Sequence, residues 1–283
     1  MTRRLPTLPI LAAVLACCGP AAAAAGAAQH ELTASEGTVE AKLTYEQEAN
    51  SIGPPEFAGL TLQISRAGQV FYDQPVSSHA CLSACQLETF RTAPLAVKDL
   101  EGNSQPDVIL HLNTGGAHCC TVVQVFAFDP GTGTYGLVER DFGDPGAMLT
   151  DVADDGSLEF ESADDRFAYL FTSYVYSGLP LQIWRFQEGR FIDATRSFPR
   201  ALTADAARQF KYFLATRNQG HGLGLLAAWA ADEELLGRGA LVMRTLRREQ
   251  RAHRLRSAEA PTQGGGVYVR KLERFLAKSG YTA

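Results

Sequence analysis

Apolar and polar residues alternate along much of the first two thirds of the chain, and this pattern predicts β-structure. Residues 38–45 and 60–64 place an apolar side chain at every second position, which is the period of a half-buried strand. Ala67-Gly68 is typical of a tight turn, and residues 70–72 continue beyond it as a hairpin partner. The pattern therefore predicts an N-terminal β region over residues 29–90.

The hydrophobic period changes to that of a helix in the last third of the chain. Four segments have this period, residues 204–218, 223–236, 240–257 and 267–278. Thr203 is a candidate N-cap, and Gly264–Gly266 predicts a flexible link before the last helix. Glycine stands where a C-terminal cap belongs at three positions, Gly220, Gly237 and Gly280. We expect residues 199–283 to form a helical C-terminal region.

An internal duplication occupies residues 91–198, between these two regions. One copy begins at Val97 and the other at Leu149, an offset of 52 residues. Each copy has an acidic loop, a strand, an edge rich in glycine and aromatic residues, and a second strand. Repeats of this size predict small stacked sheets.

The two acidic loops carry oxygen-bearing side chains at alternating positions. A tight turn brings every second residue to one centre, and a carboxylate further along closes the site, as in a calcium-binding loop. The candidate ligands are Asp99, Glu101, Asn103 and Asp107 in the first copy, and Asp151, Asp155 and Glu159 in the second. Ala153 replaces one ligand of the second loop. Two interpretations follow: calcium sites, or ordinary β-turns whose acids face water.

The loops resemble the Asp-x-Asp-Gly-Asp-Gly signature of FG-GAP and VCBS repeats, the blade units of integrin-α-like β-propellers. The stretch Asp99–Val108 matches best, and Asp151–Phe160 matches more weakly. The duplicated region also looks like uncharacterised secreted bacterial proteins. The resemblance implies calcium in a structural role and a surface that binds a protein or glycan ligand. The expected fold class is therefore α+β, with a β-rich core of two tandem propeller-blade-like repeats followed by the helical region.

The first 28 residues are typical of a secretory signal. They contain no acidic residue, begin with the basic pair Arg3 and Arg4, and continue with an apolar stretch over residues 8–16. That stretch is shorter than the ~20 residues that a membrane helix needs, and no later run is long enough for one. We expect a periplasmic or secreted protein without a transmembrane span. Cleavage at an Ala-x-Ala site would release it, whereas lipid modification of Cys17 is the alternative.

Four cysteines remain beyond the signal, Cys81, Cys85, Cys119 and Cys120. An even number in an exported protein predicts two disulfides. A bond between the two adjacent cysteines needs a strained ring, and neighbours on a strand point to opposite faces. We therefore expect Cys81 and Cys85 each to bond one of the adjacent pair, in either order. A zinc or copper site that includes His79 and His118 is the alternative.

The formal net charge of −5 conceals a strong asymmetry. Residues 29–198 sum to −15 and residues 199–283 to +8. Six arginines lie on one predicted helix and its end, Arg244, Arg247, Arg248, Arg251, Arg254 and Arg256. They could contact a membrane surface or an anionic polymer, whereas Leu241, Met243, Leu246 and Leu255 suggest packing on the β region. Nucleic acid is not an expected partner of an exported protein.

Motifs of several common hydrolases and nucleotide-binding proteins are absent from the sequence. We find no Gly-x-Ser-x-Gly, no His-Glu-x-x-His and no phosphate-binding loop. The sequence therefore favours a non-enzymatic binding or structural role in the cell envelope or outside it, with a protein or glycan ligand. The alternative is a secreted hydrolase of glycans with Asp164 and Asp165 near its site, since paired carboxylates beside Phe167 and Tyr169 suit that chemistry.

Overall fold

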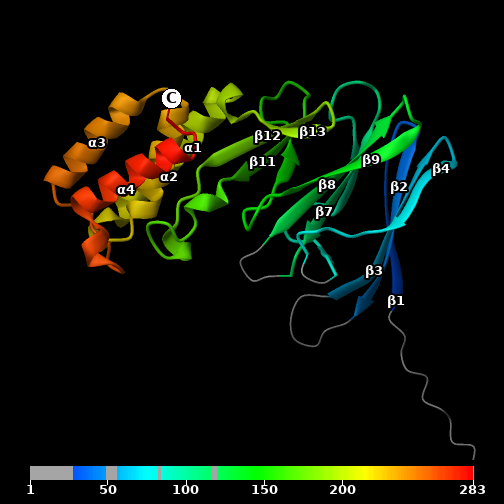
Figure 1. Cartoon of the computed structure of the whole chain (residues 1–283), viewed down its shortest axis with the longest axis horizontal. Coiled ribbons are helices and arrows are strands. Elements are labelled where there is room, and N and C mark those ends of the chain that lie inside the picture. Colours follow the sequence, from blue (N-terminus) through cyan, green and yellow to red (C-terminus); the bar gives the residue numbers. More distant parts are fainter. Residues whose placement is uncertain (1–27, 49–55, 82–83, 116–119, 283) are drawn as a thin grey trace, which may run out of the picture.

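Three antiparallel sheets are followed by a group of helices in the computed structural model of the chain (Figure 1). The structure describes residues 28–48, 56–81, 84–115 and 120–282. The predicted export signal, with Cys17, lies outside these residues except for its last position. The coarse fold class predicted from the sequence, α+β with the helices at the C-terminal end, is confirmed.

Sheet A is a four-stranded meander at one end of the molecule. Its strands pair in chain order, β1 (Ala28–Glu36), β2 (Val39–Glu48), β3 (Glu56–Arg66) and β4 (Gln69–Pro75). The predicted turn is present, because Ala67 and Gly68 both have positive φ between β3 and β4. The alternation in β3 buries one side of the strand, namely Leu60, Leu62 and Ile64.

Apart from β5, the strands of sheets B and C come from the duplicated region. Sheet B contains β5 (Gln86–Leu87), β6 (Leu95–Lys98), β7 (Asp107–Asn113), β8 (Thr121–Asp129) and β9 (Thr134–Asp141). Sheet C contains β10 (Met148–Thr150), β11 (Glu159–Ala163), β12 (Leu181–Gln187) and β13 (Arg190–Asp193). All of the strand pairs in the three sheets are antiparallel.

The sheets form successive layers because strand β7 is buried on both faces. Its side chains at positions 108, 110 and 112 join the core shared with sheet A. Ile109, which points to the opposite face, packs in a second core with Phe160 and Phe186 of sheet C. This explains why β7 is a nearly continuous apolar run and not an alternating one.

Four helices follow sheet C in the chain and form the helical unit. They are α1 (Pro199–Thr216), α2 (Leu223–Leu235), α3 (Gly239–Arg251) and α4 (Gly265–Lys278). Leu181 and Ile183 of β12 pack against Phe198 and Leu202 at the start of α1. A larger core within the helical unit includes Phe213, Trp229, Leu246 and Leu272. In Figure 1 the helices, sheet C, sheet B and sheet A follow one another across the molecule.

The helix ends confirm some predictions and correct others. Gly220, Gly237 and Gly280 all have positive φ, as a C-terminal cap requires. Thr203 is not an N-cap: α1 begins at Pro199, whose fixed φ suits a first helical position, and the Thr203 hydroxyl donates to the Pro199 carbonyl at 2.7 Å. Helix α3 ends at Arg251, earlier than its predicted end.

The predicted disulfide connectivity is wrong for Cys81 and Cys85, which bond to each other. They lie four positions apart in the sequence, and their Cα atoms are 5.4 Å apart, within the usual range for a disulfide. A short turn brings these sulfurs together, so neither is available to cross-pair or to bind a metal as a thiolate. Cys120 is also disulfide-bonded, and Cys119 and His118 lie outside the described residues.

Within the described ranges, no helix has both the length and the apolar character that crossing a bilayer requires.

Candidate functional site

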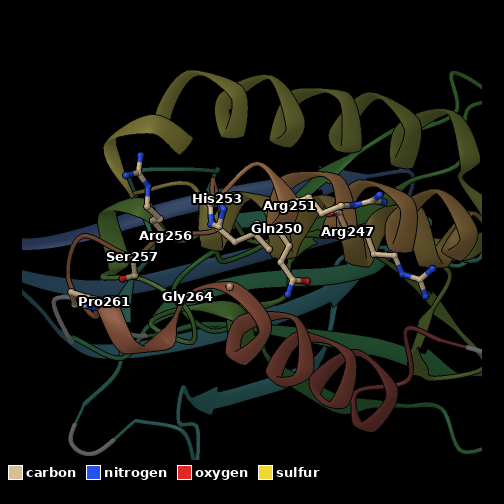
Figure 2. Close-up of a pocket in the computed structure, with 10 residues that line it drawn as sticks. Arg247, Gln250, Arg251, His253, Arg256, Ser257, Pro261 and Gly264 are labelled. Carbon is tan, nitrogen blue, oxygen red and sulfur yellow. Dashed lines mark hydrogen bonds between the residues drawn. The ribbon is translucent and has the colours of Figure 1, made fainter.

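A hollow of the helical unit lies between the end of α3 and the start of α4. Its volume is about 900 Å³. Its lining is rich in arginine and comprises Arg247, Gln250, Arg251, His253, Leu255, Arg256, Ser257, Pro261, Gly264 and Gly265. Figure 2 shows Arg247 and Arg251 at one end and Arg256 at the other, with Gln250 pointing from α3 towards α4. We call this hollow the basic pocket.

Amphipathic spacing in α3 directs its arginines to the pocket and to solvent. Val242 and Leu246 lie buried in the helical core, and Thr245 is buried on the same side. Side chains three and four residues apart share a helix face, so the remaining face is exposed. That face carries Arg244, Arg247, Arg248 and Arg251.

One buried carboxylate anchors the arginines behind the pocket. The Glu249 side chain is 0% exposed and accepts from Arg217 at 3.0 Å, Arg248 at 3.1 Å and Arg254 at 2.6 Å. Burial raises the pKa of Glu249, but the hydrogen bonds from Arg254 and Arg248 outweigh burial and hold it below its usual value. Glu249 is therefore ionised, and its single negative charge leaves this cluster of three guanidinium groups with a net positive charge.

The three arginines that line the basic pocket have no such partner. Among the described residues, no carboxylate lies within ion-pair distance of Arg247, Arg251 or Arg256. The Arg251 Nε donates to the Arg247 carbonyl at 3.3 Å, one turn earlier in α3. Cations at the C-terminal end of a helix interact favourably with the helix dipole, which offsets part of their mutual repulsion. The pocket thus holds positive charge that the described structure does not neutralise.

Two glycines at the start of α4, Gly264 and Gly265, form part of the wall of the pocket. A Cβ at Gly264 would lie 2.5 Å from the Leu255 carbonyl oxygen, so only glycine allows this approach. The Gly265 N–H donates to the same carbonyl at 2.7 Å. Gly264 is the N-cap of α4 and Gly265 begins the helix. The predicted flexible link is therefore a fixed connection between α3 and α4.

The first predicted calcium loop is closed by hydrogen bonds to its own backbone. Asp99 accepts from the N–H groups of Asn103 at 3.0 Å and Ser104 at 2.8 Å. Asp107 accepts from the Leu100 N–H at 3.3 Å. The acidic side chains thus replace missing backbone partners in the turn.

The second loop repeats the same arrangement at the predicted offset of 52 residues. Asp151 accepts from the N–H groups of Asp155 at 3.0 Å and Gly156 at 2.8 Å, and Glu159 accepts from Val152 at 3.3 Å. Both loops border one small hollow of about 230 Å³. The two segments therefore have the same local fold and lie side by side.

Several predicted calcium ligands are already engaged with protein groups. Burial raises the pKa of Asp107 to about 7, with a smaller contribution from the charge of Glu101. Glu159 is buried against Arg185 at 3.0 Å, and Asn103 donates to Glu101 at 3.1 Å. In the part of the chain that the structure describes, no three His, Cys, Asp or Glu side chains are grouped to hold a metal ion. Calcium binding stays a prediction.

The two adjacent carboxylates of the alternative hydrolase hypothesis have different surroundings. Asp164 is buried and accepts from the Arg166 Nε at 2.8 Å and the Tyr281 hydroxyl at 2.7 Å. Both carboxylates border a hollow of about 610 Å³ together with Arg140. Burial and the nearby Asp144 raise the pKa of Asp165. Asp164 thus binds Arg166 and Tyr281, whereas Asp165 has no ion-pair partner among the described residues.

Comparison with known proteins identifies two partial relatives. A probable thylakoid lumen protein of Synechocystis sp. is 31% identical over 152 residues, which cover 51% of this chain and 44% of the relative. An uncharacterized protein of Sinorhizobium fredii is 36% identical over 141 residues, which cover 47% of this chain and 21% of the relative. The chain thus spans less than half the length of either relative. No protein-family model and no solved structure matches the chain.

Sequence reasoning identified the arginines of the basic pocket but not the pocket. The helical spacing places Arg247 and Arg251 together, and this signal was visible. Gln250, His253 and Ser257 carry no motif and become neighbours only through the turn after α3. The Gly264–Gly266 triplet was the further signal, because consecutive glycines also permit a close backbone approach.

Proposed function

We propose that this chain is an exported, non-enzymatic binding protein whose helical unit holds an anionic ligand in the basic pocket. The observation that carries the proposal is the set of three arginines, Arg247, Arg251 and Arg256, that line one hollow without a carboxylate partner among the described residues. Guanidinium groups donate two parallel hydrogen bonds to a phosphate or a carboxylate. A volume of about 900 Å³ accommodates a ligand larger than a single phosphate ion.

Three features support export. The first 28 residues have the pattern of a secretory signal. The disulfide between Cys81 and Cys85 is of a kind that persists in oxidising compartments. One relative is named as a probable protein of the thylakoid lumen. We propose a periplasmic or secreted location, with lipid modification at Cys17 as the alternative.

Calorimetric titration of the mature protein with inorganic pyrophosphate tests the anion pocket. A charge-assisted hydrogen bond contributes about 1.5–3 kcal/mol, so each lost arginine lowers affinity about tenfold or more. We expect the Arg251→Gln and Arg256→Gln variants to bind pyrophosphate at least tenfold more weakly.

The matched control is Arg190→Gln, an exposed arginine in sheet C that pairs with Glu188. Its affinity should equal that of the wild type. Equal pyrophosphate affinity in all four proteins, or no binding to any of them, contradicts an anion site at this pocket.

We also propose that sheets B and C are two blade-like units of FG-GAP or VCBS type that bind calcium at the paired loops. The support is the shared hydrogen-bond pattern around Asp99 and Asp151. A thermal melt with millimolar calcium, compared with magnesium, tests the calcium part. An ion at 100 times its Kd adds about 2.7 kcal/mol to the free energy of unfolding, whereas an unchanged Tm contradicts calcium binding.

Hydrolysis of a glycan in the hollow beside Asp165 is the second candidate function. The observation that favours it is the position of Asp165 beside Asp164 and Arg140 at this hollow, and burial raises the pKa of Asp165 in the direction that suits a general acid. Release of reducing sugar from envelope glycans by the wild type, with loss in Asp165→Asn, would support it. Release that is absent, or unaffected by the substitution, contradicts it.

A further inference from the structure

The basic pocket continues into a strip of arginines along the exposed face of α3. Arg244, Arg247, Arg248 and Arg251 follow the spacing i, i+3, i+4, i+7, which places them on one side of the helix. Arg247 and Arg251 also line the basic pocket, and Arg248 pairs with Glu249 at 3.1 Å. Because a helix rises ~5.4 Å per turn, Arg244 extends the positive surface by about one turn beyond Arg247 and Arg248. We call these four arginines the α3 strip.

Acidic residues do little to offset this surface. Residues 239–278 contain ten lysines and arginines and three glutamates, a formal charge of +7. Glu249 lies beneath the strip and is buried among three arginines. Both oxygens of Glu259 accept from Ser173, from its N–H and from its hydroxyl, each at 2.6 Å. Of the three glutamates, only Glu273 on α4 remains as an exposed acid without such a contact.

The shape and chemistry of the strip favour a flexible linear ligand over a membrane surface. A helix that binds a bilayer inserts large apolar side chains beside its cations. On α3, Val242 and Leu246 are instead buried in the helical core, and Leu241 and Met243 are partly buried against it. No large apolar side chain of α3 is exposed, and the basic pocket is concave. A flat bilayer cannot follow a hollow, whereas a polymer strand can enter it.

We propose that the ligand is a linear polyanion, one end of which occupies the basic pocket while the next anionic groups pair with the α3 strip. This inference rests on the proposed anion-binding function and names its ligand class. A polymer with an anionic group on each unit gains further ion pairs as it lengthens, whereas a single small anion does not. Substitution of Arg244 distinguishes the two cases, because this residue belongs to the α3 strip and not to the pocket lining.

The test measures affinity against polymer length on the intact mature protein. The probes are inorganic pyrophosphate, polyphosphates of graded length and polygalacturonate, each titrated at several salt concentrations. We expect affinity to rise at least tenfold from pyrophosphate to the longer polyphosphates. The slope of log K against log salt should also steepen, since longer ligands pair with more arginines. The better-bound polymer shows whether the anionic group is a phosphate or a carboxylate.

Single substitutions test which residues cause the gain in affinity with polymer length. Arg244→Gln should weaken binding of the long polymer about three- to tenfold and leave pyrophosphate affinity unchanged. Lys211→Gln, an exposed cation on α1 far along the chain from the strip, should change neither. Both side chains are exposed, so we expect each variant to keep the fold.

The outcomes separate this inference from the proposed function. Pyrophosphate binding without any gain from polymer length overturns the polyanion and leaves the anion pocket standing. Equal effects of Arg244→Gln and Lys211→Gln also overturn it. Binding to vesicles of phosphatidylglycerol but to neither polymer assigns the strip to a membrane and overturns the polymer. Failure of every anion, pyrophosphate included, rejects the proposed function itself.

Discussion

Two carboxylates lie inside the helical unit in opposite surroundings. Glu249, at the back of the basic pocket, is enclosed by the guanidinium groups of three arginines. Asp232 of α2 is equally inaccessible, but the charge next to it is another acid, Asp205. Burial first, and then Asp205, raise the pKa of Asp232 well above its usual range, whereas the pKa of Glu249 is lowered. One site is a buried anion and the other a buried neutral acid.

The difference between Glu249 and Asp232 shows how a small helical unit can contain many arginines and leave some of them free to bind a ligand. Glu249 fixes Arg217, Arg248 and Arg254 from the inside, and the cluster remains positive overall. The arginines of the basic pocket then have no internal competitor for an incoming anion. Asp232 provides no such anchor, because a protonated carboxyl attracts no cation. The position of the ionised acid therefore selects which arginines remain available.

Replacing Glu249 should produce the largest effect on stability. Glu249→Gln removes the anion and leaves three guanidinium groups close together. Breaking a fully buried ion pair costs about 3–5 kcal/mol, and the half-exposed Arg248 reduces this to about 2–3 kcal/mol. Urea unfolding near pH 7 measures the change.

The matched control is Glu273→Gln, an exposed acid of α4, which should change stability by less than about 0.5 kcal/mol. Because the pKa of folded Glu249 is lowered, its contribution is present above the ordinary glutamate pKa of about 4.3 and is lost as the pH falls below that value. The stability of the Glu249→Gln variant should not show this decrease at low pH. A loss in Glu249→Gln no larger than in the control would show that the cluster is not held electrostatically.

The opposite substitution at Asp232 should stabilise the protein. Below the ordinary aspartate pKa of about 3.9, folded and unfolded states are both protonated, and the group contributes nothing. Between that value and the raised folded pKa, only the unfolded state releases its proton, so stability falls as the pH rises, by about 1.4 kcal/mol per pH unit. Asp232→Asn abolishes this loss and should add about 1–2 kcal/mol at pH 7, because imperfect packing of the amide offsets part of the larger linkage gain.

Urea unfolding of Asp232→Asn and the wild type at pH 6 and pH 8 tests the sign. The advantage of the variant should grow with pH. A variant that is less stable than the wild type at both values would indicate that Asp232 is ionised in the fold, and the contrast with Glu249 would disappear.

Asp164 offers an intermediate case, with one arginine and one hydroxyl as partners. Tyr281→Phe removes the hydroxyl that donates to Asp164 at 2.7 Å but leaves Arg166 in place. We expect a loss of about 1 kcal/mol, the usual contribution of a buried hydrogen bond. Thermal unfolding measures it, with the exposed Tyr169→Phe as the control. A loss as large as that of Glu249→Gln would mean that a hydroxyl anchors an acid as strongly as three arginines do.

Local periodicity was sufficient to predict much of the fold. The alternation in residues 60–64 identified β3, and the 3.6-residue period identified all four helices, although α1 begins and α3 ends earlier than predicted. The 52-residue offset identified two loops with the same hydrogen bonds around Asp99 and Asp151. These features depend on neighbours within about ten residues, which the sequence displays directly.

Features that depend on chain reversal or on packing between elements could not be predicted in the same way. The pairing of Cys81 with Cys85 depends on a turn with no clear sequence signal. In the sequence, Glu249 lies among arginines, a pattern typical of a solvated helix face. Only the structure shows that Arg217 packs against Glu249 and that this carboxylate is buried. The basic pocket also required the contact of Gly264 with the Leu255 carbonyl. The candidate site was therefore visible as a charge pattern but not as a cavity.

Arginine side-chain NMR during a titration with inorganic pyrophosphate tests the central claim most directly, because the Nε–H signals report each guanidinium separately. If the basic pocket binds anions, the signals of Arg247, Arg251 and Arg256 shift together and saturate, while that of Arg190 stays in place. Signals that do not move, or that drift equally at all arginines without saturation, would contradict a built anion site.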